Sequence, residues 1–252
     1  MTDYTITNSF TLPSKGLVYG KEINPQIDLR SMTTAEEMKR LNHSDRPYKM
    51  MSEVINDCIV NDPGIHVYDM CIPDYQFLLH KLRIVTYGSS YKTTSRCPFC
   101  GIENNHVLNL ETDLTLVPFN KDTFDKYSEI TLPQSKKVIK FRMQSPRILD
   151  DITTRTKEVR KAASTQNGDP AFLITLQMLI DTIDGQRYEE FQLDPFLRKL
   201  PMMDTNYIIK AAQKLNTSFG LEGDVDRTCD FCGLDYKSSF RITSEFFGPS
   251  ID

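Results

Sequence analysis

Several features that mark large classes of proteins are missing from this sequence. Its 252 residues carry 30 Lys and Arg against 34 Asp and Glu, so there is no excess of positive charge with which to bind nucleic acid in bulk. No stretch approaches the roughly 18 consecutive apolar residues of a transmembrane helix, and no charged-then-apolar signal segment opens the chain. We therefore expect a protein that is made and used in the cytosol.

The sequence also lacks the common catalytic motifs. It contains no phosphate-binding loop of the form G-x-x-x-x-G-K-[ST], and none of its four histidines is spaced for pairing with a Ser or Cys nucleophile. No pair of carboxylates stands out as a general acid and base. These absences favour a function other than catalysis.

What the sequence does contain is a repeated cysteine motif. C-x-F-C-G occurs twice, with its thiols at Cys97 and Cys100 and again at Cys229 and Cys232. In such a motif a tight turn aims two thiolates at one point, and Gly adopts a backbone conformation that a Cβ resists. A structural zinc needs four ligands, so we predict that these four cysteines bind one zinc ion, Zn2+.

Other interpretations of the cysteines and histidines are weaker. A redox dithiol or two unrelated core cysteine pairs would fit the spacing, but neither motif has the strand-turn-helix setting of a redox site. Cys58 and Cys71 lie in apolar contexts and are expected as buried free thiols. His80 and His106 are expected on the surface or in packing contacts. A closed site of four thiolates leaves no position for water, so zinc catalysis is not expected.

Local patterns predict an α+β fold. It has helical N-terminal and central segments, with short strands around a four-cysteine zinc ribbon formed by the two distant C-x-x-C knuckles. Thr33 and Glu36 form the capping box of a helix whose inner face we place at Met38 and Leu41. Residues 171–183 predict the most apolar helix, and Asp204 is expected to cap the last one.

We divide the chain into five regions. They are an N-terminal arm with extended segments (1–30), a helical region (31–90), the first knuckle with β-strands (91–145), a second helical region (146–220), and the second knuckle with a strand and the C-terminal tail (221–252). The tail carries two adjacent aromatics, Phe246 and Phe247, whose exposure would be costly unless they pack on this fold or on a partner.

A resemblance to a known family rests on five segments. They are residues 12–19 (LPSKGLVY), 32–37 (MTTAEE), 74–88, the first knuckle CPFC at 97–100, and Phe246-Phe247. In this order they resemble the T4-like contractile-tail bacteriophage baseplate family, whose members are baseplate hub subunits or hub-assembly proteins. The two knuckles and Lys15-Gly16 are the most specific parts of the resemblance.

The resemblance implies a structural or assembly role in a phage tail baseplate, without enzymatic activity. The implied partners are other baseplate or tail hub proteins and the tape measure, with several copies arranged in a ring. No membrane is implied, and nucleic acid is not an expected partner. The implied locations are the host cytoplasm during assembly and then the tail baseplate of the virion. We expect residues 12–19 and 246–249 to make the assembly contacts.

Two other functions stay open on the sequence alone. One is a zinc-ribbon nucleic-acid-binding protein of phage transcription or replication, which salt-dependent binding to DNA or RNA would reveal. The other is an enzyme with a cryptic site, for which activity on cell-wall fragments would be the simplest test.

Overall fold

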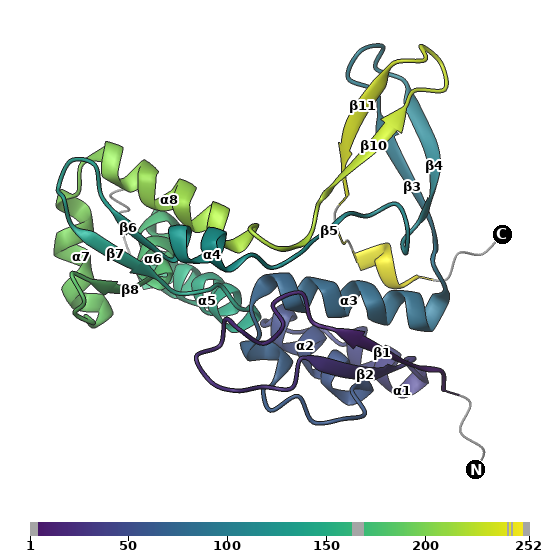
Figure 1. Cartoon of the computed structure of the whole chain (residues 1–252), viewed down its shortest axis with the longest axis horizontal. Coiled ribbons are helices and arrows are strands. Elements are labelled where there is room, and N and C mark those ends of the chain that lie inside the picture. The colour runs from purple at the N-terminus through teal and green to yellow at the C-terminus, as the bar shows by residue number, and fades with distance from the viewer. Residues whose placement is uncertain (1–4, 163–168, 241, 243, 249–252) are drawn as a thin grey trace.

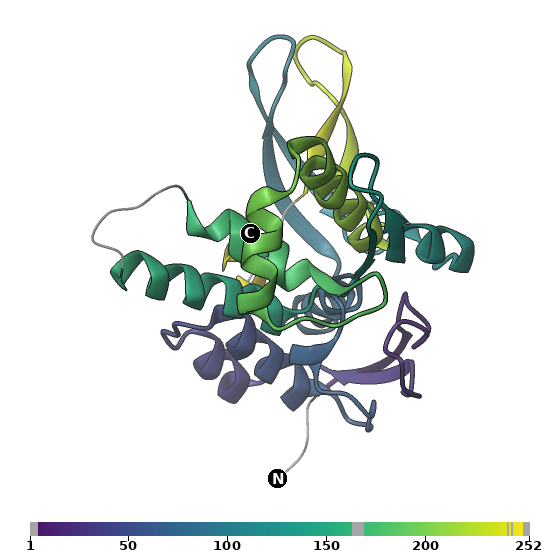
Figure 2. The same cartoon turned by 90° about the vertical axis from the view of Figure 1, so that its left-hand side faces the viewer.

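The computed structural model describes residues 5–162, 169–240, 242 and 244–248. It is a mixed α+β structure, as the sequence predicts. Two lobes are joined to each other, and two β-hairpins project away from both of them (Figure 1). The view turned by 90° shows the same projection (Figure 2). No helix in the described part of the chain is both long and apolar enough to cross a membrane.

The N-terminal lobe is built around one helix. Its elements are β1 (Thr7–Thr11), β2 (Gln26–Arg30), α1 (Thr34–Arg40), α2 (Pro47–Cys58), the 3-10 helix η1 (Val67–Asp69) and α3 (Ile72–Tyr87). Strand β2, helix α2, strand β9 (Gly220–Leu221) and the C-terminal 3-10 helix η2 (Ser244–Phe247) all pack on α3. Helix α3 is therefore buried on most of its faces, and Leu78 and Leu82 at its centre are fully buried.

Helix α1 begins as predicted but faces the other way. The capping box of Thr33 and Glu36 is present. However, Met38 and Leu41 are about two-thirds exposed, so the predicted inner face is wrong. The buried side chain is Glu36, which pairs with Arg30 at 2.8 Å. That hydrogen bond is the main reason why the pKa of Glu36 is lowered to about 2.

The segment 12–19 folds onto its own lobe. Buried Asp74, in the first turn of α3, accepts hydrogen bonds from the backbone N–H and the hydroxyl of Ser14 and from the hydroxyl of Tyr19. Tyr19 also accepts a bond from the N–H of Cys71 at 3.2 Å. Burial raises the pKa of Asp74. Leu12 and Ser14 are fully buried, so the start of the segment is not available as an assembly contact, whereas Lys15 and Leu17 are exposed.

The second lobe holds a three-stranded antiparallel sheet in the order β6-β7-β8, with five helices. Its elements are α4 (Lys121–Ser128), β6 (Glu129–Thr131), β7 (Val138–Phe141), α5 (Pro146–Ala162), α6 (Pro170–Leu179), β8 (Ile180–Ile183), α7 (Glu190–Lys199) and α8 (Met202–Asn216). Its apolar core is separate from that of the N-terminal lobe. Residues 171–183 are not one helix as predicted, because Ile180, Thr182 and Ile183 suit a strand and pair with the free edge of β7.

Asp204 has a different role from the predicted one. Pro201 is the N-cap residue of α8, and Asp204 lies inside the first turn, fully buried. Its two carboxylate oxygens accept the backbone N–H groups of Gln134 and Ser135, each at 2.8 Å. Asp204 therefore anchors the turn between β6 and β7 to α8, and the predicted cap is wrong.

Helix α5 joins the two lobes. Its buried Asp150 accepts the backbone N–H of Lys49 at 2.8 Å and the hydroxyl of Tyr68 at 3.1 Å, so a residue of one lobe caps the first turn of α2 in the other. A bidentate ion pair between Arg147 and Asp69 lies beside it. These charge-assisted bonds fix the second lobe against the first.

The tail returns to the N-terminal lobe. Phe246 and Phe247, in the 3-10 helix η2 (Ser244–Phe247), are buried in its core. The fully buried guanidinium of Arg83 donates to the carbonyl of Phe246 at 2.7 Å and to that of Gly88 at 2.9 Å. The two aromatics therefore pack on their own fold and are not available as an assembly contact, which corrects our expectation for 246–248. Pro249 lies outside the described residues.

The chain passes into the second lobe and returns from it through a narrow neck. There β5 (Leu116–Val117) pairs with β9 (Gly220–Leu221). Gly220 has a φ of +101°, and a Cβ at this position would lie 2.8 Å from Cβ of Pro73 at the start of α3. Only glycine fits here without strain or displacement of α3.

We predict that Gly220→Ala lowers the free energy of unfolding by about 2–4 kcal/mol, because it adds both backbone strain and overlap with Pro73. The matched control is Gly223→Ala, since a Cβ there would meet only the carbonyl of Phe240 at an ordinary 3.6 Å. Chemical denaturation of the two variants measures the difference. Equal stabilities would show that the neck is not held by this contact.

Candidate metal centre

The four cysteines lie in the turns of two hairpins. β3 (Ser90–Arg96) pairs with β4 (Glu103–Asn109), and β10 (Asp224–Thr228) pairs with β11 (Asp235–Ser239). Cys97 and Cys100 occupy the turn of the first hairpin, and Cys229 and Cys232 that of the second. The two turns lie side by side at the far end of the projection in both views (Figures 1 and 2).

Both turns have the same backbone structure. The N–H of Gly101 donates to the carbonyl of Cys97 at 2.9 Å, and the N–H of Cys97 donates to Ile102 at 2.9 Å. The equivalent bonds of the second turn are 2.9 and 3.0 Å. Gly101 and Gly233 have φ values of +76° and +70°, the conformation for which the motif requires glycine. The repeated sequence therefore produces a repeated local structure.

The four sulfur atoms converge on one point. All four Sγ atoms lie within 4.8 Å of one another. The distance is 3.7 Å between Cys97 and Cys232 and 3.6 Å between Cys100 and Cys229. These distances exclude disulfides, whose S–S bond is about 2.05 Å. They are close to the edge of about 3.8 Å expected for a tetrahedron of sulfurs around zinc with Zn–S bonds of about 2.3 Å.

Few contacts other than the cysteines join the two hairpins. Within the described residues no backbone ladder connects them. The buried side chain of Asn104 accepts the N–H of Asp230 at 2.9 Å, and Tyr236 Oη bonds to Ser95 Oγ at 2.6 Å. Among the described residues, the buried apolar cluster at this end consists of Cys97, Cys229 and Tyr236, with Cys232 packed against it. The paired hairpins thus have almost no apolar core of their own.

Comparison with known proteins gives one family. A family model described as T4 bacteriophage base plate protein matches residues 4–248. The chain belongs to this family. No curated protein and no solved structure gives a significant match.

Membership of the baseplate family confirms the resemblance seen in the sequence. It supports a structural role in the phage baseplate, interaction with other tail or baseplate proteins, and a location in the tail baseplate of the virion. A structural baseplate family argues for a non-enzymatic role, and the nucleic-acid-binding alternative is not favoured.

The histidines of this baseplate protein lie outside the cysteine cluster. His80 is buried on α3 and stacks on Phe246, and burial lowers its pKa to about 4. His106 on β4 contacts Tyr236 Oη at 3.3 Å. Both therefore make packing contacts, as expected. Cys58 and Cys71 are buried free thiols, also as expected.

The two residues that join the hairpins were not singled out in the sequence. Asn104 and Tyr236 lie at inward positions of alternating strands, four residues beyond Cys100 and Cys232 respectively. This shared offset from the second cysteine of each motif is the signal that could have identified them. Asn104 and Tyr236 therefore occupy equivalent positions of the two hairpins, one with an amide side chain and the other with a phenol.

The thiols differ in their affinity for protons. Backbone N–H groups of Cys232 and Phe231 lower the pKa of the Cys229 thiol to about 6. The N–H of Leu234 lowers the pKa of Cys232, but burial and hydrogen bonds to the other cysteines outweigh it and raise that pKa to about 12. Four sulfurs this close resist simultaneous ionisation in the absence of a cation.

We predict that Asn104→Ala loosens the second turn, because it leaves the N–H of Asp230 without its partner at a cost of about 1–2 kcal/mol. Hydrogen exchange at the Asp230 amide should accelerate about tenfold. The control is Asn105→Ala, which removes the neighbouring exposed side chain and should leave that amide unchanged. Equal exchange in both variants would contradict the coupling.

Proposed function

We propose that this chain is a structural or assembly component of the hub region of a contractile phage tail baseplate, and that one zinc ion held by Cys97, Cys100, Cys229 and Cys232 fixes its shape. The convergence of these sulfurs from the two ends of a long chain segment carries the proposal. Membership of the family supports a place in the baseplate, and the hub region is our more specific proposal.

The chemistry of the cluster favours zinc. Four thiolates in a tetrahedral arrangement suit zinc or an iron site, and zinc is the usual ion of a closed, redox-inactive structural centre. The two near-identical turns are typical of zinc knuckles. Because four thiolates fill the coordination sphere, the ion would have no open position for substrate.

The paired hairpins need such an ion more than either lobe does. They lack a backbone ladder between them, and their shared core consists of the cysteines and Tyr236. A module with so little apolar core commonly depends on a metal for its fold. Bound zinc would convert two separate hairpins into one rigid projection of fixed direction.

A rigid projection is useful to an assembly protein because it presents contacts in a defined geometry. We propose that the neighbours are other hub proteins and the tape measure, that several copies form a ring, and that assembly takes place in the host cytoplasm. The lobes, tied together by Asp150 and Arg147, would form the base from which the projection extends.

We predict one zinc per chain by elemental mass spectrometry of the purified protein. Cys97→Ser or Cys229→Ser should lose most of the metal, because one of four ligands is removed from a site worth on the order of 10 kcal/mol in isolated zinc peptides. Hydrogen exchange should then increase in the paired hairpins but not in α2 or α8. Cys58→Ala removes a buried thiol elsewhere and should retain the metal. A metal-free wild type would refute the zinc site.

The hub assignment is tested by a mass-spectrometric inventory of purified tails and of baseplate intermediates from infected cells producing a tagged chain. We expect the chain to copurify with hub intermediates in the host cytoplasm. Retention in finished tails would identify a subunit, and its absence from them an assembly factor. Copurification with outer baseplate parts alone, or with none, would overturn the hub assignment without affecting the zinc site.

A further inference from the structure

The end of the projection carries an exposed apolar patch that the metal site does not use. We call residues 96–103 and 228–235 the hairpin tip. Phe99 is 61% exposed and Phe231 73% exposed, each two residues after the first cysteine of its motif. Ile102 and Leu234, each five residues after that cysteine, are also exposed. Each turn of the tip therefore presents one exposed phenylalanine and one exposed branched aliphatic side chain at equivalent positions.

The charge around this patch is negative. The hairpin tip contains Arg96 but also Glu103, Asp230 and Asp235. A divalent ion held by four thiolates would add a net charge of about −2. Two tips facing each other would bring like charges together, so electrostatics opposes tip-to-tip pairing. The tip instead suits an apolar surface that is not acidic.

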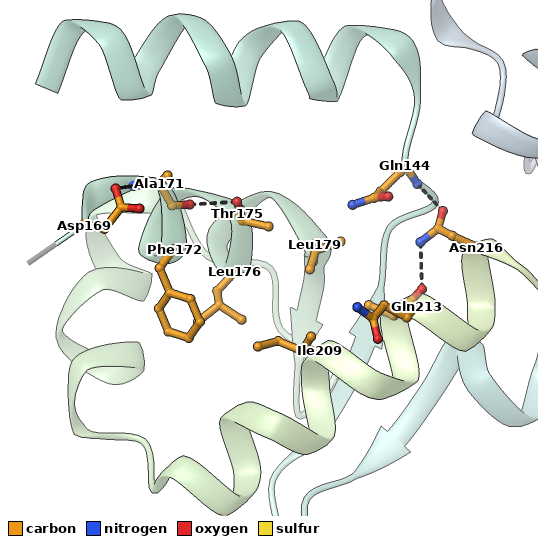
Figure 3. A pocket seen from close by; sticks show the side chains of 11 residues that line it. Gln144, Asp169, Ala171, Phe172, Thr175, Leu176, Leu179, Ile209, Gln213 and Asn216 are labelled. Atoms are coloured by element: carbon orange, nitrogen blue, oxygen red, sulfur yellow. Dashed lines mark hydrogen bonds between the residues drawn. The ribbon is translucent and has the colours of Figure 1, made fainter. Parts of the chain in front are cut away.

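Such a surface lies on the second lobe of the same chain. A groove of about 540 Å³ runs between α6 and α8 (Figure 3). We call it the α6–α8 groove. Phe172, Leu176, Leu179 and Ile209 line its middle, and the amides of Gln144 and Gln213 lie at one end. Helix α6 contains no charged residue. The groove could therefore receive aromatic side chains together with a turn of backbone.

The polar groups of the groove suit a protein turn. The side-chain amides of Gln144 and Gln213 make no hydrogen bond within the described part of the chain, whereas that of Asn216 is already bonded to Gln144 N and Ala212 O. Free amides can both donate to and accept from exposed peptide groups. The one acidic group of the lining, Asp169, is paired with Arg160 at 2.9 Å.

The two regions also differ in net charge. Residues 116–219 hold 16 Lys and Arg against 13 Asp and Glu, a net charge of +3. The two hairpins, residues 90–109 and 224–239, hold 4 against 5, and the hairpin tip within them holds 1 against 3, a net charge of −2. Opposite charges on the lobe and on the part that bears the tip favour a head-to-tail approach of two copies.

We propose that the hairpin tip of one copy inserts Phe99 and Phe231 into the α6–α8 groove of a second copy. The contact is heterologous, so a pair of copies keeps one free groove on the copy that inserts its tip and one free tip on the other, and repetition gives a closed ring or an open chain. It does not depend on the hub assignment, because both surfaces belong to this chain.

The association is weak. A fully buried aromatic side chain covers at most about 250 Å², so two of them fall short of the roughly 800 Å² per partner in a standard interface. We therefore expect oligomers that grow with concentration in the micromolar to millimolar range. Raising the salt concentration should weaken them, because it screens the attraction between lobe and tip.

Sedimentation velocity of the full-length chain over this concentration range tests the contact. The tip variant Phe99→Ser/Phe231→Ser and the groove variant Phe172→Ser should each self-associate at least about tenfold more weakly than the wild type. The control is Phe191→Ser, on α7 of the same lobe but outside the groove and 75% exposed, which should associate like the wild type. All of these side chains are substantially exposed, so the variants should fold, and circular dichroism verifies this.

Mixing the two defective variants distinguishes the possible modes. The tip variant keeps an intact groove and the groove variant an intact tip, so a head-to-tail contact predicts a one-to-one heterodimer that does not grow further. A tip-to-tip contact would leave the groove variant fully able to dimerise, which would overturn the proposal. A monomeric wild type at the highest concentration, or equal association of all variants, would overturn it as well.

Discussion

The hairpin projection depends on bringing four sulfur atoms together from two turns that are far apart in the chain. Closing a flexible loop of about 128 residues costs roughly 4 kcal/mol of chain entropy. The cluster does not bear this cost alone, because the neck already places the bases of the hairpins side by side through the β5–β9 pair. Close packing of Gly220 on Pro73 anchors that neck to α3. The neck therefore holds the hairpin bases together, which shortens the loop that the sulfurs must close.

Buried charged side chains connect the irregular segments. Asp74, Asp150 and Asp204 each accept backbone N–H groups from a different part of the chain, and Arg83 donates to carbonyls of the tail and of the loop before β3. These bonds involve an ionisable side chain and, apart from that between Arg83 and Gly88, join segments distant in sequence, so they are strong and specific. Losing one partner would leave an uncompensated buried charge, which is why these segments have one defined position.

Features fixed by neighbouring residues could be predicted from the sequence. The capping box of Thr33 and Glu36 and the two near-identical cysteine turns depend on local chemistry. Features that depend on a distant partner could not. Glu36 is buried instead of Met38 because Arg30 is nearby, and Phe246 is buried because α3 and Arg83 receive it. The end of helix α6 before Ile180 could not be predicted either, because it depends on pairing of the following strand with the free edge of β7.

The C-x-F-C motif explains why a metal would replace an apolar core at the hairpin tip. In a turn this short, the backbone conformation that points some side chains inward also determines which side chains point outward. Phe99 and Phe231 are exposed, whereas Cys97 and Cys229 are buried and all four sulfurs converge on one point. Turning the aromatics inward would give the hairpins a conventional core but remove the apolar patch. If the cysteines bind a metal, the phenylalanines can stay on the surface. The same C-x-F-C motif would then provide both the stability of the paired hairpins and their apolar contact surface.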